Sequence, residues 1–161
     1  MASFALPARL SMLAVVASSF GGIRDLPAQG PFQYQYAAKV VCGTPRGGFP
    51  AVVQAYATSI NVNNPSDSLT VFLRKRLVIT FPPGFQIPQK PLQLFNDSLL
   101  PTFALLTDCQ DLRRRYRLQQ PFFEGFVVIQ STLPLDVTTV FTVPGGIDVV
   151  QVAERKVFVV R

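Results

Sequence analysis

Apolar and polar side chains alternate along most of this chain from residue 29 onward, and short turns rich in proline and glycine interrupt the alternation. In the first such run, Phe32, Tyr34 and Tyr36 are separated by glutamines. A period of two places alternate side chains on opposite faces of a β-strand, so each run predicts a strand with one buried and one wet face. The 14 prolines and 10 glycines favour many short elements over long helices. The chain is therefore expected to be an all-β protein.

The alternating runs predict about seven strands. They cover residues 32–42, 51–62, 69–81, 103–109, 122–131, 135–143 and 147–160. Residues 111–120 have the apolar spacing of a helical turn, and residues 85–98 are expected to be irregular with at most one short strand. Lys75 interrupts the apolar phase of its run, which predicts a bulge or an edge position. Strands without intervening helices indicate a single-domain, immunoglobulin-like β-sandwich, with a closed β-barrel as the alternative.

The first 28 residues differ in character from the rest. Arg9 precedes a short apolar run, residues 10–20, which is rich in small residues and is followed by two glycines. This order is typical of a secretory signal peptide, and the run is shorter than the roughly 20 residues that a membrane-spanning helix needs. We therefore expect residues 1–28 to be a signal peptide or a disordered N-terminal segment and residues 29–161 to form the sandwich domain. The protein is expected to be exported rather than integral to a membrane.

Cys42 and Cys109 are the two cysteines of the chain. An even number of cysteines in an exported protein predicts a disulfide between them. The alternative is a pair of buried free thiols, and a metal site built on two thiols without histidine is less favoured than either.

Histidine is absent from the chain, which removes the commonest general base and the commonest metal ligand. Carboxylate pairs are the catalytic arrangement that remains, and Asp108, Asp111, Glu124 and Asp136 are the candidates. These acids are too scattered to predict a catalytic pair, and capping of a turn and pairing with nearby arginines explains Asp108 and Asp111 more simply. No phosphate-binding loop or nucleophile elbow is present. We therefore expect no enzymatic activity, no cofactor and no metal.

The formal net charge is +6, and much of it is clustered. The residues that could bind a polyanion are Arg113, Arg114, Arg115 and Arg117 in one cluster, and Arg74 and Arg76 in another. An acidic glycan or another acidic polymer could contact such patches. The alternative is an ordinary solvated surface, and nucleic acid is not the expected partner because no nucleic-acid-binding module is recognisable.

Two segments could join the protein to another subunit. The aromatic run of Phe32, Tyr34 and Tyr36 and the apolar run of residues 157–160 are strands that could pair with another chain's open edge. The alternative is that both pair within their own sheets. The favoured function is a non-enzymatic structural or assembly protein, located in the periplasm, at the cell surface or outside the cell. Its partner would be a second copy or another envelope protein; a polyanion-binding module is the alternative function.

Several sequence blocks also resemble a known group of proteins. They occur in order as YAAKVVCG at residues 36–43, YATSINVNNP at 56–65, FLRKR at 72–76, DC at 108–109, EGFVVI at 124–129 and LDV at 135–137. Over residues 32–153 the chain resembles an uncharacterised family of small, exported bacterial proteins rich in β-structure. The resemblance implies a β-rich fold and a pairing of Cys42 with Cys109, and it implies no activity.

Overall fold

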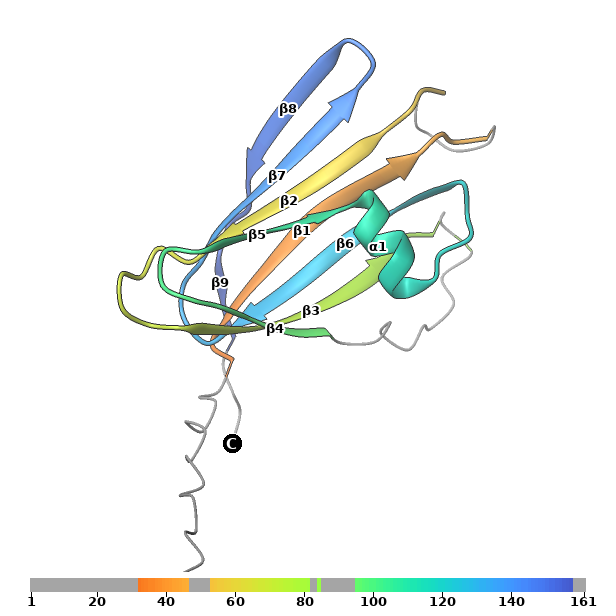
Figure 1. Ribbon diagram of the computed structural model, residues 1–161. Coiled ribbons are helices and arrows are strands. Elements are labelled where there is room, and N and C mark those ends of the chain that lie inside the picture. The colour runs from red at the N-terminus through yellow and green to blue at the C-terminus, as the bar shows by residue number, and fades with distance from the viewer. Residues whose placement is uncertain (1–31, 47–52, 82–83, 85–94, 158–161) are drawn as a thin grey trace, which may run out of the picture.

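The computed structural model describes residues 32–46, 53–81, 84 and 95–157, which form two antiparallel β-sheets packed face to face (Figure 1). Sheet A has the strand order β4-β3-β6-β1-β9, and sheet B has the order β5-β2-β7-β8. The elements are β1 (Tyr34–Gly43), β2 (Ala57–Asn63), β3 (Val71–Ile79), β4 (Phe95–Leu99), β5 (Ala104–Asp108), α1 (Cys109–Tyr116), β6 (Phe122–Ser131), β7 (Asp136–Val143), β8 (Gly146–Gln151) and β9 (Arg155–Lys156). The N-terminal segment 1–28 lies outside the described residues, so its predicted role as a signal peptide stays a prediction.

The alternation in the sequence becomes the alternation of burial in the structure. In β1, Tyr36, Ala38 and Val40 are buried, while the residues between them are half-buried. They pack in a core with Ile60 and Val62 of sheet B. Burial of each such aliphatic side chain stabilises the fold by roughly 1.5–3 kcal/mol before entropy costs. The sandwich prediction is therefore confirmed, because the described strands form two separate sheets and not one closed barrel.

The connections differ from the immunoglobulin order, in which the first and second strands are neighbours. Here β1 pairs with β6 along its whole length, from Tyr34 opposite Ser131 to Gly43 opposite Phe122. Of the described strand pairs, β3–β4 and β7–β8 join consecutive strands, and the others join strands far apart in the chain, a pairing that the local pattern does not specify.

Lys75 continues the inward phase of β3, so the expected bulge or edge position is wrong. Its register is unbroken, because it lies opposite Phe95 of β4 on one side and Ile129 of β6 on the other. The residue is 5% exposed, and its ammonium group lies 2.6 Å from the Asp97 carboxylate and 3.4 Å from the Thr107 hydroxyl. A buried charge persists when it is paired and hydrogen-bonded, which is what these two partners supply.

The predicted helical turn forms, with shifted bounds. Helix α1 spans Cys109–Tyr116 rather than residues 111–120, because Asp108 caps its first turn by accepting a hydrogen bond of 2.7 Å from the Asp111 N–H. At the other end Arg117 adopts a left-handed conformation (φ 53°), and its N–H donates to the Arg113 carbonyl, which stops the helix.

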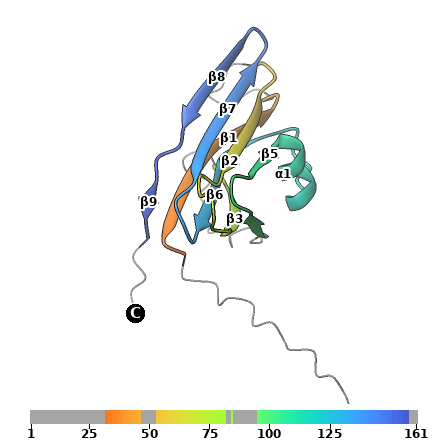
Figure 2. The ribbon, with the colours of Figure 1, turned by 60° about the vertical axis from the view of Figure 1, so that its left-hand side comes forward.

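The predicted strand 147–160 is broken in two. The chain leaves sheet B after β8, the Val152 N–H donates to the Val137 carbonyl, and Arg155 then pairs with Gln35 of sheet A (Figure 2). The segment therefore crosses from the edge of sheet B to the edge of sheet A, next to the Tyr34 end of β1. Of the apolar run 157–160, Val157 donates its N–H to the Gln33 carbonyl, and the remainder lies outside the described residues.

Candidate functional site

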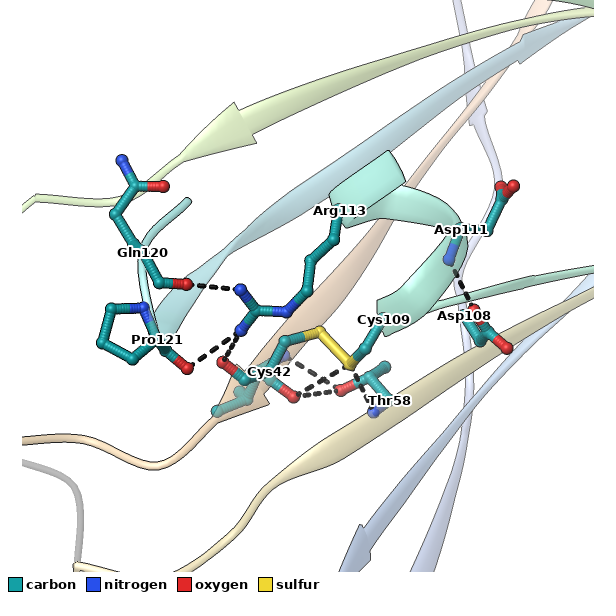
Figure 3. Close-up of a disulfide and its surroundings, with 9 residues drawn as sticks. Cys42, Thr58, Asp108, Cys109, Asp111, Arg113, Gln120 and Pro121 are labelled. Atoms are coloured by element: carbon teal, nitrogen blue, oxygen red, sulfur yellow. Dashed lines mark hydrogen bonds between the residues drawn. A yellow bond between two sulfur atoms is a disulfide. The ribbon is translucent and has the colours of Figure 1, made fainter. Parts of the chain in front are cut away.

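The predicted disulfide joins Cys42 of β1 to Cys109 at the start of α1, and so links sheet A to the chain leaving sheet B (Figure 3). Its Cα atoms are 5.7 Å apart, within the usual range for a disulfide. Gly43 follows with φ +95°, and a Cβ there would collide with the Pro121 carbonyl, so only glycine fits.

Arg113 is part of this structural cluster rather than a free ligand-binding group. Its guanidinium donates to the carbonyls of Gln120 and Pro121 and lies 5.1 Å from the centre of the Phe123 ring (Figure 3). These contacts hold the loop between α1 and β6 in place. Polyanion binding by Arg113 stays a prediction, and the backbone carbonyls that accept from its guanidinium leave it fewer free donors than the sequence suggests.

The next two arginines of α1 pair with an acid on the same helix. Arg114 and Arg115 contact the Asp111 carboxylate at 3.0 and 2.8 Å. Burial by itself would raise the pKa of Asp111, but the hydrogen bonds from the two arginines outweigh it and hold that pKa below its ordinary value. Arg114 keeps 78% of its side chain exposed, and Arg117 is exposed at the helix end. The helix therefore offers less free positive charge than its sequence suggests.

A second basic surface lies on the outer face of sheet A. Register places Arg74, Gln130, Gln35 and Arg155 side by side across β3, β6, β1 and β9, so all four share one face. By the period of two, Arg76 and Lys39 lie on that face as well. We call Lys39, Arg74, Arg76 and Arg155 the basic face.

The contacts of the basic face leave it positively charged. Arg74 lies 4.3 Å from the centre of the Phe32 ring, and Lys39 pairs with Glu124 at 3.3 Å. Lys39 and Arg155 were missed by the sequence reasoning, because their neighbours in space come from other strands. The arginines of α1 are neighbours in the sequence and can be recognised there. The residues of the basic face come from different strands and can be recognised as a group only when the strand register is known.

The aromatic run predicted for assembly is divided between core and surface. Tyr36 is 1% exposed; its hydroxyl accepts a hydrogen bond from the Leu135 N–H at 2.8 Å and donates to Glu154 at 3.1 Å. Burial raises the pKa of Tyr36 to about 12. Tyr34 packs against the core, and Phe32 lies under Arg74. Tyr36 is therefore a core residue, which agrees with the alternative that this ring fills the core of its own subunit, and the place of the aromatic run at a subunit contact stays a prediction.

Strand β8 is the most exposed strand of the two sheets. All six of its residues are exposed, including Ile147 at 71%, Val149 at 60% and Val150 at 42%. It pairs with β7 on one side, and no described strand pairs with the other side. Figure 2 shows β8 at the margin of the molecule. Apolar side chains on an unpaired sheet edge are the usual template for pairing with another chain.

The candidate carboxylates are engaged in structural contacts. Asp108 caps α1, Asp111 pairs with two arginines, and Glu124 contacts Lys39 and the Thr80 hydroxyl. Asp108 and Asp111 line a shallow surface depression of about 390 Å³ together with Arg114 and Arg115.

Across the described ranges, no group of three or more histidine, cysteine, aspartate or glutamate residues is arranged to hold a metal ion. Within the same ranges, no helix is both long enough and apolar enough to cross a membrane.

Comparison with known proteins identifies the fold and no family. No family model matches the chain, and no curated protein matches it significantly. The crystal structure of Thermotoga maritima 1070 superimposes with a TM-score of 0.50 at 11% sequence identity, over 77% of this chain and 95% of that one. A likeness at this identity shows a shared fold alone. The resemblance to the uncharacterised exported family stays a prediction.

Proposed function

We propose that this protein is a non-enzymatic, exported assembly subunit that associates through the open edge of sheet B. The observation that carries the proposal is β8, a strand exposed on both faces and paired, among the described strands, with β7 alone. A strand in this state presents a row of backbone donors and acceptors together with exposed aliphatic side chains.

The composition of β8 supports this use. Soluble proteins protect their sheet edges with lysine, proline, bulges or a covering loop. Asp148 is the one charged residue of β8, and the strand contains neither lysine nor proline. Its register with β7 is regular from Gly146 to Gln151, without a bulge. The edge is therefore straight, nearly uncharged and apolar.

The disulfide supports the exported part of the proposal. Disulfides persist in oxidising compartments and are rare in the reducing cytosol. Cys42 is completely buried, so a cross-link formed during export would be shielded from reductants. The periplasm, the cell surface and the extracellular space all fit this chemistry.

The oligomeric state tests the proposal. Sedimentation of the oxidised protein at rising concentration should show dimers or larger species, and Val149→Lys should raise the dissociation constant at least tenfold, because a charged side chain would lie on the apolar edge. Leu106→Lys is the matched control: Leu106 is 58% exposed and lies on β5, the opposite edge of sheet B. A wild-type protein that stays monomeric throughout, or an equal loss in both variants, would contradict the proposal.

The basic face supports a second candidate, binding of an acidic polymer. We expect the double change Arg74→Gln/Arg155→Gln to lower the salt concentration that elutes the protein from heparin, a sulfated polyanion, because two charges leave the row across sheet A. The same change at Arg114 of α1 and at Arg117, just after the helix, is the control and should have the smaller effect. A larger effect from the helix pair would place polyanion binding on α1 instead.

A further inference from the structure

Sheet A has an open edge of its own, on β1. Strand β9 pairs with β1 at Tyr34 and Gln35 only, and farther along β1 the edge is closed again. There Gly43 exchanges two backbone hydrogen bonds with Tyr56, and the N–H and carbonyl of Val41 both contact the Thr58 hydroxyl, at 2.9 and 2.8 Å.

The open part of this edge lies at Ala37 and Lys39. In an antiparallel strand the backbone groups of alternate residues point to the same side. The groups of Val41 and Gly43 point away from β6, so those of Ala37 and Lys39 point the same way. No backbone partner for them exists on that side among the described residues. An extended segment placed there would find unpaired donors and acceptors.

A groove accompanies this open edge. It has a volume of about 230 Å³ and is lined by Ala37, Lys39, Thr139, Phe141, Val150, Gln151, Val152 and Ala153. It thus lies between β1 of sheet A and the β7–β8 hairpin of sheet B. Thr139 is 1% exposed, and its hydroxyl oxygen is buried without a hydrogen-bond partner within the described part of the chain. Buried hydroxyls are normally paired, because an unpaired one has lost its hydrogen bonds to water without gaining any in return.

The groove lies where one more strand of sheet A, next to β1, would pack over β8. Val150 lies opposite Thr139 in register and so belongs to the inward-facing side of β8, yet it is 42% exposed. Sheet A ends with β1 and the two-residue β9, and no described strand of it covers β8 (Figure 2). A strand added beside Ala37 and Lys39 would extend sheet A over β8 and cover Val150.

We propose that the added strand is β8 of a second copy of this chain. This inference rests on the proposed function and names the acceptor site and the partner. One chain carries both halves of the contact: an open acceptor edge on β1, and β8, a fully exposed strand whose outer edge has no partner among the described strands. A two-fold axis would then place each β8 beside the other copy's β1, which is the self-complementary geometry of most homodimers.

The charges on the two halves agree with this pairing. Asp148 is the one charge of the donor strand, whereas the acceptor strands β1 and β9 carry Lys39, Arg155 and Lys156. Pairing of two β8 edges with each other would instead bring together two aspartates and leave the groove unfilled. The β1 edge is therefore favoured as the acceptor.

Proline at position 37 tests the acceptor. Ala37→Pro removes the N–H on the open side of β1 while leaving the ladder to β6 unbroken. We expect at least a tenfold rise in the dimer dissociation constant, measured by sedimentation. Ala37→Ser is the matched control, because it keeps the N–H and nearly the same volume, and it should dimerise like the wild type. If Ala37→Pro fails to fold, Ala153→Trp is the second variant. Ala153 is exposed and lines the groove, so a tryptophan there would fill the groove and should raise the dimer dissociation constant by a similar factor.

Mixing variants distinguishes this inference from the proposed function. Chains with Ala37→Pro keep an intact donor, and chains with Val149→Lys keep an intact acceptor, so the two should form mixed dimers at concentrations where neither variant dimerises alone. Dimers that need β8 but are unaffected by the acceptor variants, or a mixture without mixed dimers, would overturn the β1 site while leaving assembly through β8 standing. A monomeric wild-type protein would overturn both.

Discussion

Reduction of the Cys42–Cys109 disulfide should remove a large part of the protein's stability. The two cysteines are 67 positions apart in the chain. For a closed loop of that length, the chain-entropy relation gives about 4 kcal/mol of stabilisation at 25 °C, through restriction of the unfolded chain. Many domains have a total stability of about 5–15 kcal/mol, so the loss would be a substantial fraction of it.

The native state should change little when the bond is broken. Cys42 is completely buried, Cys109 packs against the core, and the Thr58 N–H lies 3.1 Å from the Cys109 sulfur. Reduction removes no heavy atom, although the two sulfurs must separate from bonding to van der Waals distance, so most of the expected loss arises in the unfolded state. Reduction is therefore a cleaner perturbation than substitution, which also removes buried sulfur atoms.

Urea unfolding of the oxidised and reduced protein measures the effect. The chain has four tyrosines and no tryptophan, so tyrosine fluorescence and far-ultraviolet circular dichroism are the suitable signals. With a urea dependence of about 1–3 kcal/mol per molar, the midpoint should fall by roughly 2 M on reduction. The double variant Cys42→Ala/Cys109→Ala is the control, and its midpoint should not respond to reductant. A loss below about 1 kcal/mol in the reduced wild type would refute the entropic reasoning.

Two further predictions concern single side chains. Asn64→Ala should destabilise the protein by about 3 kcal/mol in urea unfolding, because the completely buried Asn64 amide donates to the carbonyls of Leu69, Leu99 and Leu100 at 2.8–3.2 Å. Asn63→Ala, which loses one exposed contact of 3.3 Å to Asp136, is the control, and a similar cost for both would contradict the role of the buried amide. Asp111→Asn should make the free energy of unfolding less dependent on pH in the acidic range. The pKa of Asp111 is lowered in the folded state, so its carboxylate stabilises the fold above the unfolded pKa of about 4, and this stabilisation is lost as pH falls through the folded pKa. The difference in unfolding free energy between wild type and variant should therefore shrink as pH falls below about 4, and a constant difference would argue against the arginine pairing.

Local signals in the sequence were enough for the class of fold and for most of the elements. The period of two in Tyr36, Ala38 and Val40 requires one buried face, and turn residues separate most of the strands where the structure ends them. The predicted strand 122–131 has the bounds of β6. The cysteine pair likewise predicted its own disulfide, because the chain offers no other partner for either thiol.

Local signals could not specify which strands become neighbours in a sheet. The candidate sites depend on this strand pairing. The pattern of residues 147–160 suits a strand throughout, yet the first half pairs with β7 and the second with β1, since the segment crosses between sheets at residues 152–154. Lys75 is a charged residue in an apolar phase, and its burial is tolerated because Asp97 and Thr107, from other strands, contact its ammonium group.

The sequence by itself thus determined the period of the strands, the turns and the disulfide, because each depends on residues that are close in the chain or have no alternative partner. The tertiary structure decided which side chains are free to bind. It used Arg113 and Tyr36 in structural contacts, placed Arg74 and Arg155 on one face across four strands, and left one edge of β8 and part of β1 without a described partner. The physical reason is that binding sites on a sheet are made by register and by edges, and both arise from pairing between segments that are distant in the chain.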